Sequence, residues 1–182
     1  MSGQKFWTLA TSGFISLICV ASALAQTSNT KKEELPVTKR WQQSVGDWIV
    51  NCAEDQNARK SCAMSQTLSN SKTRQTIASW AISRDGNGKT NATVTVPLGV
   101  LVSVGLRAGV DEKSAFDVPY RTCIAQGCVA TFEMSNQLIA QLGKAEKFSF
   151  VTRTAQEQPL TVEFSLRGFA KAHEILVQET GK

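Results

Sequence analysis

Apolar and polar residues alternate in short stretches along most of the chain after residue 45. This two-residue period is that of β-strands with one buried face. It predicts strands over residues 48–52, 62–68, 76–83, 92–96, 100–107, 118–122, 129–134, 148–152 and 160–166. The stretch 92–110 is the most apolar of these, and proline and glycine interrupt it at 97–99. We therefore expect it to form core strands with a break at 97–99 and not a membrane span.

Two short segments change to the period of a helix. Leu138, Ile139 and Leu142 lie at helical spacing. Ser135 can cap the start of this helix and Gly143 can end it. A second helix is predicted near the end of the chain, where apolar residues again recur at helical spacing. Many short strands with few helix signals indicate a mainly β fold built from two packed sheets.

The first 25 residues have the pattern of a signal peptide. Lys5 supplies the positive charge, residues 6–20 are uncharged and largely apolar, and 23–25 read Ala-Leu-Ala. An N-terminal membrane anchor is the alternative, but serine, threonine and glycine dilute the apolar run. We expect cleavage after residue 25, a flexible polar arm over 26–40 and a single domain over 41–182.

Removal of this segment leaves 19 Lys and Arg against 15 Asp and Glu, a formal charge of +4. A surplus of this size favours anionic partners such as lipopolysaccharide or host glycans. The sequence has no basic patch with interleaved aromatic residues, the feature expected of a nucleic-acid binder. We therefore expect a scattered positive surface and no nucleic-acid partner.

Four cysteines remain after cleavage, an even number in an exported chain, which favours disulfides. Of the three possible pairings, Cys52 with Cys62 and Cys123 with Cys128 is the local one. We prefer it because both pairs stand where adjacent strands would end. Residues 120–133 predict a β-hairpin closed by the second pair, with Gly127 in its turn.

Two other uses of the cysteines fit the sequence less well. A four-thiolate zinc site needs two to four residues between paired ligands, whereas nine separate Cys52 from Cys62. Neither pair has the Cys-x-x-Cys spacing of a thioredoxin-like redox site. Cys19 lies within the apolar run, but the residues before it do not form a lipobox. We therefore expect no lipid anchor, metal or cofactor.

No arrangement typical of a catalytic site is present. His173 is the only histidine, and the sequence has no nucleophile elbow, His-Glu-x-x-His motif or paired-carboxylate pattern. We expect His173 to lie on a helix surface and the protein not to be an enzyme. The loops around Asp55, 85–89 and Gln156 are the candidate contact surfaces, because loops on a rigid scaffold usually make the contacts.

Four short motifs together resemble one family of exported bacterial proteins. They are Gly46-Asp47-Trp48 followed by Cys52, Pro97-Leu98-Gly99-Val100, Cys123 with Gly127-Cys128, and Leu166-Arg167-Gly168-Phe169. In order and spacing they resemble the invasion-associated locus B family, over residues 41–177. Family members commonly have an aromatic residue before Gly-Asp-Trp, where this chain has Val45.

The resemblance implies an immunoglobulin-like antiparallel β-sandwich that resides in the periplasm or at the outer membrane. It also implies a contribution to host-cell invasion in some pathogens, and it brings no catalytic residues. We therefore expect an exported, non-enzymatic binding or accessory protein whose partner is a protein or a component of the envelope or host surface. A periplasmic module that binds anionic glycan or lipopolysaccharide is the alternative.

Overall fold

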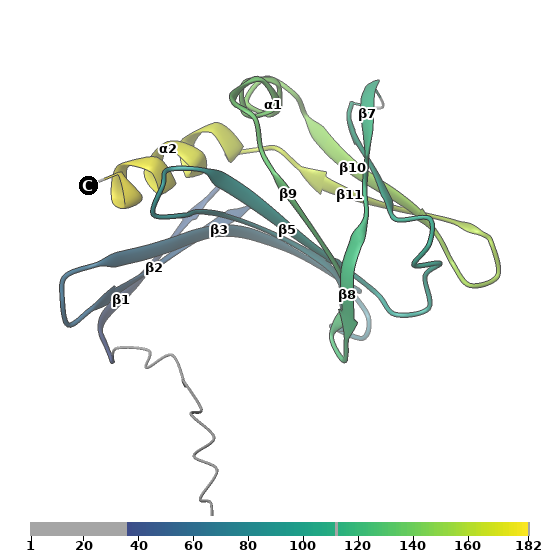
Figure 1. Ribbon diagram of the computed structural model, residues 1–182, viewed down its shortest axis with the longest axis horizontal. Helices are drawn as coiled ribbons and strands as arrows, with labels where there is room; N and C mark the ends of the chain where they lie inside the picture. The colour runs from purple at the N-terminus through teal and green to yellow at the C-terminus, as the bar shows by residue number, and fades with distance from the viewer. Residues whose placement is uncertain (1–35, 112, 182) are drawn as a thin grey trace, which may run out of the picture. The chain divides into compact units, whose positions relative to one another are not determined.

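The computed structural model describes residues 36–111 and 113–181, which form two antiparallel β-sheets and two helices (Figure 1). The large sheet has the strand order β1-β2-β3-β4-β5-β9-β8, and the small sheet has the order β11-β10-β6-β7. The strands are β1 (Val37–Val45), β2 (Trp48–Asp55), β3 (Lys60–Ser69), β4 (Thr76–Arg84), β5 (Thr90–Val96), β6 (Leu106–Val110), β7 (Lys113–Val118), β8 (Tyr120–Ile124), β9 (Gly127–Glu133), β10 (Lys147–Arg153) and β11 (Pro159–Ser165). This confirms the predicted mainly β sandwich, immunoglobulin-like in the broad sense of two antiparallel sheets packed face to face.

The chain changes sheets at short connections. Strands β1 to β5 follow one another as antiparallel neighbours, and the segment 97–105 then leads into β6 of the small sheet. Only Pro119 separates β7 of the small sheet from β8 of the large one. In Figure 1 these two strands run one after the other between the sheets. The two sheets are thus joined along one side by β7 and β8, which follow each other almost without interruption.

Helix α1 (Asn136–Leu142) connects β9 to β10, and its predicted cap is present, because the Leu138 N–H donates to the Ser135 hydroxyl at 3.1 Å. Helix α2 (Phe169–Thr180) packs on the face of the large sheet that also faces the small sheet. Its buried residues recur at helical spacing and are Phe169, Ala172, Ile175 and Leu176. No helix in residues 36–111 or 113–181 is both long and apolar enough to cross a bilayer.

A cluster of aromatic side chains fills the space between the two sheets and α2. Its members are at most 1% exposed and are Trp48, Trp80, Phe148, Phe150, Phe164 and Phe169. Trp80 lies at the centre, with its ring centroid 5.0 Å from that of Trp48 and 4.9 Å from that of Phe148. Because these residues come from β2, β4, β10, β11 and α2, the cluster joins all the main layers of the domain.

The segment 100–105 is not the core strand that its apolar alternation predicted, whereas residues 97–99 form the expected break between strands. Val100 makes a single bridge to Thr154, and 102–104 form a turn. Leu98, Val102 and Val104 are 55%, 54% and 51% exposed. The prediction was wrong because alternation of apolar and polar residues does not show whether a segment pairs with another strand. Here the segment connects the two sheets, since β5 ends at Val96 and β6 begins at Leu106.

Strand β1 begins at Val37, inside the range 26–40 for which we predicted a flexible arm, and it precedes the first strand that we predicted. It pairs with β2 along the edge of the large sheet, and most of its side chains are exposed. Main-chain hydrogen bonds hold such an edge strand, so its sequence needs no apolar alternation. The predicted signal peptide 1–25 and the first ten residues of the predicted arm lie outside the described residues.

Candidate functional site

Two of the sequence motifs meet at one corner of the sandwich, although about 120 residues separate them. Gly46 in the β1–β2 turn and Gly168 before α2 have φ angles of +59° and +88°. A Cβ on Gly46 would overlap the Arg167 carbonyl group, and a Cβ on Gly168 would overlap that of Val45. The two main-chain segments can approach this closely only because both residues are glycine.

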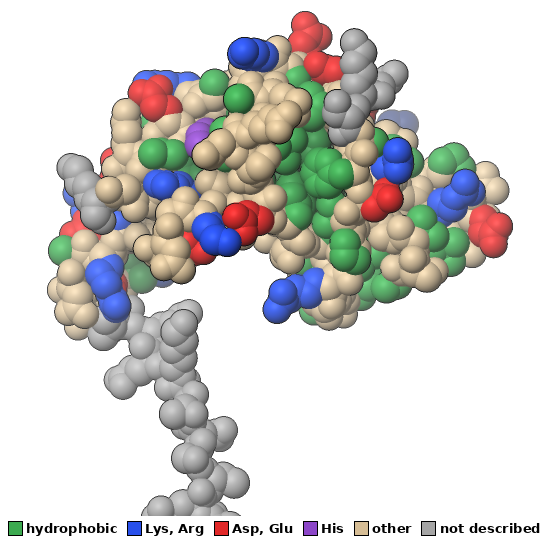
Figure 2. Space-filling view, turned by 45° about the horizontal axis from the view of Figure 1, so that its top comes forward, with side chains coloured by type: hydrophobic (Ala, Val, Ile, Leu, Met, Phe, Trp, Pro, Cys, Tyr) green, Lys and Arg blue, Asp and Glu red, His purple; other side chains and the backbone are tan. Residues whose placement is uncertain are grey.

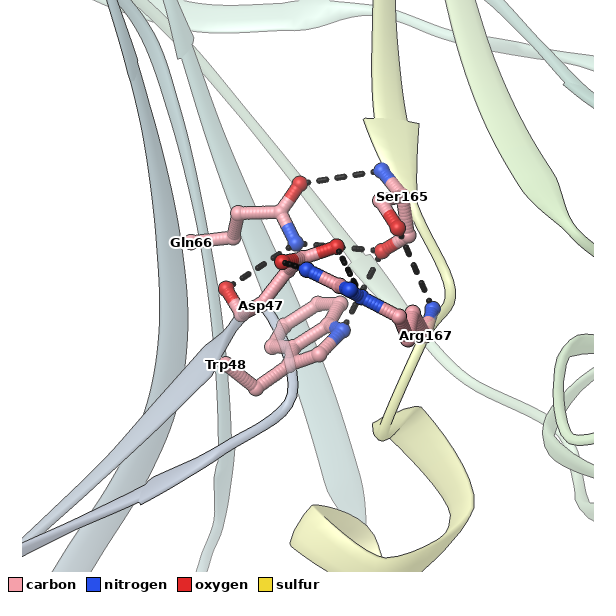
Figure 3. A network of polar contacts seen from close by, with 5 residues as sticks. All are labelled: Asp47, Trp48, Gln66, Ser165 and Arg167. Carbon is pink, nitrogen blue, oxygen red and sulfur yellow. Dashed lines mark hydrogen bonds and ion pairs between the residues drawn. The ribbon is translucent and has the colours of Figure 1, made fainter.

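A polar network surrounds this backbone contact (Figure 3). Gln66 is 6% exposed; its side-chain amide donates to the main-chain oxygens of Asp47 and Ser165, at 3.1 Å each, and accepts from the Ser165 N–H at 2.9 Å. Trp48 Nε1 also donates to the Ser165 oxygen, at 3.2 Å. Because these bonds join β2 and β3 to β11, the network holds the two sheets in register at this corner.

Asp47 and Arg167 form the outer part of the same network. Arg167 Nε donates to Asp47 Oδ2 at 3.1 Å, and Arg167 Nη2 contacts the other carboxylate oxygen. The hydrogen bond from Arg167, with a smaller contribution from Ser165, lowers the pKa of Asp47 below its usual value. The Arg167 side chain is 77% exposed, so the ion pair itself adds little stability. These motifs therefore hold the β1–β2 turn against the segment that precedes α2.

The cysteines predicted to pair locally lie directly opposite one another. Cys52 and Cys62 are paired across β2 and β3 with 4.1 Å between their Cα atoms, and Cys123 and Cys128 across β8 and β9 with 4.0 Å. Both pairs are at disulfide distance. No three His, Cys, Asp or Glu side chains in residues 36–111 and 113–181 gather as a metal site would require.

We expect the four cysteines to form both disulfides, with no free thiol among them, when the chain is produced in an oxidising compartment. Replacing Cys52 and Cys62 together with Ala should lower the free energy of unfolding by about 3 kcal/mol, and replacing the Cys123 pair by about 2 kcal/mol, because a cross-link restricts the unfolded chain less when its ring is shorter. Mass spectrometry without reductant and urea unfolding would measure the two effects. Free thiols at these positions in the exported protein would contradict the assignment.

His173 lies on α2 but is half-buried rather than on the open surface. Its ring stacks on Phe169 with 6.1 Å between centroids, and its Nε2 has no hydrogen-bond partner among the described residues. Burial lowers the pKa of His173, and the charge of Arg84 lowers it further. No hydrogen bond or ion pair among the described residues joins this ring to a serine or a carboxylate, the partners that a catalytic histidine uses.

This environment predicts a pH effect on stability. Because the folded pKa lies below the unfolded value of about 6.5, the unfolded chain binds more protons as the pH falls below 6.5. Stability should be complete well above pH 6.5 and should decrease as the pH falls through about 6.5 toward the lower folded pKa. The chain has a single histidine, so the variant His173→Phe should lose this decrease in urea unfolding. An unchanged slope in the variant would assign it to another group.

The three loops proposed as contact surfaces are ordered turns that do not form one surface. The Asp55 carboxylate accepts hydrogen bonds from the main-chain N–H groups of Asn57 and Arg59, and Asp85 Oδ1 accepts from that of Lys89. The 85–89 turn precedes β5, whereas the β10–β11 turn around Gln156 contacts the segment that follows β5. These loops therefore lie at opposite ends of β5.

A surface that sequence reasoning missed lies at the end of the sandwich where β5 stops. The exposed residues Leu98, Val102 and Val104 are there, and Ile124 at the tip of the β8–β9 hairpin is 49% exposed. The β8–β9 hairpin lies beside the end of β5, where Gly127 is so close to the Val96 carbonyl group that a Cβ would overlap it. We call these four aliphatic residues the apolar end. The sequence feature that could have indicated this surface is the pair Pro97 and Gly99, which interrupts an apolar stretch and so marks a loop with apolar residues.

Comparison with known proteins gives consistent matches. The family model for the Invasion associated locus B (IalB) protein matches residues 48–176. Invasion protein B of Bartonella bacilliformis is 34% identical over 134 residues, 71% of each chain. An invasion protein B homolog of Brucella abortus is 28% identical over 133 residues, 72% of this chain and 76% of that protein. The crystal structure of invasion associated protein B from Bartonella henselae has a TM-score of 0.69 and 27% identity, covering 76% of this chain and 95% of that one.

Proposed function

Because the chain belongs to the invasion-associated locus B family, we propose that it is an exported, non-enzymatic binding or accessory protein of the bacterial envelope that contributes to host-cell invasion. The single observation that carries the proposal is the family match over most of the described domain. The relatives are named invasion proteins, which supports the biological role.

The use that the structure makes of its polar motifs supports binding rather than catalysis. Asp47, Gln66 and Arg167 are committed to holding two turns together, and His173 stacks on an aromatic ring. A general base needs a reacting group within hydrogen-bonding distance. The polar atoms of Asp47, Gln66 and Arg167 make structural hydrogen bonds, and His173 Nε2 is buried without a partner among the described residues. A rigid sandwich with exposed loop ends suits a protein that contacts a partner.

The cysteines and the predicted signal peptide support export. Disulfides persist in oxidising compartments such as the periplasm, and both cysteine pairs are at disulfide distance. A leader over residues 1–25 would deliver the chain there. We propose the periplasm or the outer membrane as its location, with release from the cell as a further step.

Crosslinking in intact bacteria, followed by identification of captured partners and of the cell fraction, tests the proposal. We expect the chain in an envelope fraction, crosslinked to a surface or envelope component that carries no modification other than the crosslink. A deletion strain should invade host cells less well than the same strain complemented with the gene. Equal invasion by the two strains, or recovery in the cytoplasm, would contradict the proposal.

Binding of an anionic glycan is a second candidate function, which the basic residues at the apolar end favour. Lys72 and Arg74 in the β3–β4 turn, Arg121 and Arg153 are exposed. Electrostatic binding of this kind weakens as salt screens the charges. Binding of the purified chain to soluble lipopolysaccharide oligosaccharide should therefore fall across a salt series, and salt-independent binding to protein alone would reject this candidate.

A further inference from the structure

The loop that carries most of the apolar end is held in place by main-chain hydrogen bonds. Leu101 N–H donates to the Arg153 oxygen at 2.8 Å, Ala155 N–H donates to the Gly99 oxygen at 2.7 Å, and Val104 N–H closes the turn to Leu101 at 3.1 Å. The buried Thr152 hydroxyl donates to the Gly105 oxygen at 2.8 Å. The loop is therefore fixed to β10, and its exposed aliphatic side chains do not result from a loose conformation.

The exposure of these side chains has no evident role in folding. Val102 and Val104 lie in a turn, where Gly, Asn, Asp or Ser would meet the backbone requirement without exposing apolar surface. Leu98 precedes this turn, and Ile124 lies at the end of the neighbouring strand β8. Single exposed aliphatic residues are ordinary, but four at one end of a domain mark a surface that contacts something apolar.

The charges around the apolar end are mainly positive. Lys72, Arg74, Arg121 and Arg153 belong to the same end of the sandwich, and none forms an ion pair with another described residue. The opposing charges nearby are Glu157 in the β10–β11 turn and Asp117, which forms an ion pair with Arg107 at the start of β6. Figure 2 shows hydrophobic side chains together with Lys and Arg, and with fewer Asp and Glu, toward the right of the view, the end that contains the β10–β11 turn.

We propose that the apolar end docks the protein onto an anionic lipid surface. Leu98, Val102, Val104 and Ile124 would enter the boundary between headgroups and acyl chains, and the four cations would lie at the level of the phosphates. Apolar insertion combined with basic residues is the combination that gives stable peripheral binding. The inference rests on the proposed function, since it supplies the surface on which an envelope protein would act.

A lipid surface fits this end better than a protein partner does. Protein interfaces are enriched in Tyr, Trp, Phe and Met at their centre, whereas the four exposed residues are all aliphatic. They also project from a turn and a hairpin tip, and a fluid lipid surface adapts to such projecting side chains without a matching recess. The unpaired cations then complement the phosphates of the lipid headgroups.

Cosedimentation of the exported chain with lipid vesicles tests the proposal. We expect binding to vesicles of phosphatidylethanolamine with phosphatidylglycerol, and much weaker binding to phosphatidylcholine. The triple variant Leu98→Ser, Val102→Ser, Val104→Ser should bind the anionic vesicles at least about tenfold less tightly, because it removes inserted aliphatic groups. Ile49→Ser is the matched control, since Ile49 is an aliphatic residue 38% exposed on the face of the large sheet.

A second pair of variants tests the charges. Arg121→Gln should weaken binding to anionic vesicles and reduce its dependence on salt, whereas Lys144→Gln, an exposed cation beyond α1, should change neither. Unchanged thermal unfolding of each variant would show that folding is intact, as expected for exposed positions. Equal binding by the triple variant and the original chain would overturn the proposal.

Two other results would also overturn it. A dimer in sedimentation velocity that the triple variant abolishes, without vesicle binding, would assign the apolar end to a second copy of the chain. Crosslinking of the apolar end to a protein with no vesicle binding would assign it to that protein. Because the vesicle experiment uses purified protein, its failure would leave the envelope location and the invasion phenotype of the proposed function untouched.

Discussion

Replacing Trp80 with Ala should lower the free energy of unfolding by about 3–5 kcal/mol, the usual range for removing a buried aromatic side chain. Trp80 is fully buried, and its ring lies within 6.2 Å of the rings of Trp48, Phe148, Phe150, Phe164 and Phe169. The cavity would open between both sheets and α2, where no single element can shift to fill it. A loss of this size is a large share of the stability of an ordinary domain.

The matched control is Trp80→Phe. Trp80 Nε1 is buried and has no partner among the described residues, so a phenyl ring removes an unpaired donor while it keeps most of the aromatic contacts. We expect Trp80→Phe to cost clearly less than Trp80→Ala in urea unfolding of the oxidised protein. Similar losses for the two variants would show that the ring contacts are not the main contribution of Trp80.

Replacing Gly168 with Ala should destabilise the protein on the order of 3 kcal/mol, from two separate causes. A φ of +88° disfavours any residue with a Cβ, and this Cβ would also overlap the Val45 carbonyl group. To remove this overlap, the β1–β2 turn would have to move away from the start of α2, and this movement would also stretch the hydrogen bonds of Gln66.

Two other glycines separate these causes. Gly99 has a φ of +87°, but a Cβ there would meet nothing within 4 Å, so Gly99→Ala should cost only the conformational term of about 1 kcal/mol. A Cβ on Gly86 would also meet nothing within 4 Å, and its φ is not positive, so Gly86→Ala should be nearly neutral. Equal losses for Gly168→Ala and Gly99→Ala in chemical unfolding would show that the corner can open without cost.

The features that sequence predicted correctly depend on nearby residues. The β8–β9 hairpin follows from Cys123, Gly127 and Cys128 within one turn, and α1 follows from its cap and the spacing of its apolar residues. The features that it missed depend on distant partners. The 97–105 loop is fixed by hydrogen bonds to Arg153 and Ala155, about 50 residues further along, and no local pattern shows those partners.

The candidate site shows the same division. The Gly-Asp-Trp and Leu-Arg-Gly-Phe motifs were visible in the sequence and served to identify a family, but their contact with each other was not predictable from either one. The apolar end could not be predicted from its composition, because apolar residues in a β-rich chain are normally buried. Only the tertiary structure distinguishes an aliphatic residue in the core from one on the surface.

The junction at Pro119 affects how the domain unfolds. Because β7 and β8 follow each other with one residue between them, neither sheet can detach without disrupting a strand that continues into the other. Opening should therefore be cooperative, with few half-unfolded molecules for proteases to cleave or for neighbouring chains to aggregate with. Such resistance agrees with the export that we propose, because an exported protein would work beyond the reach of ATP-driven refolding.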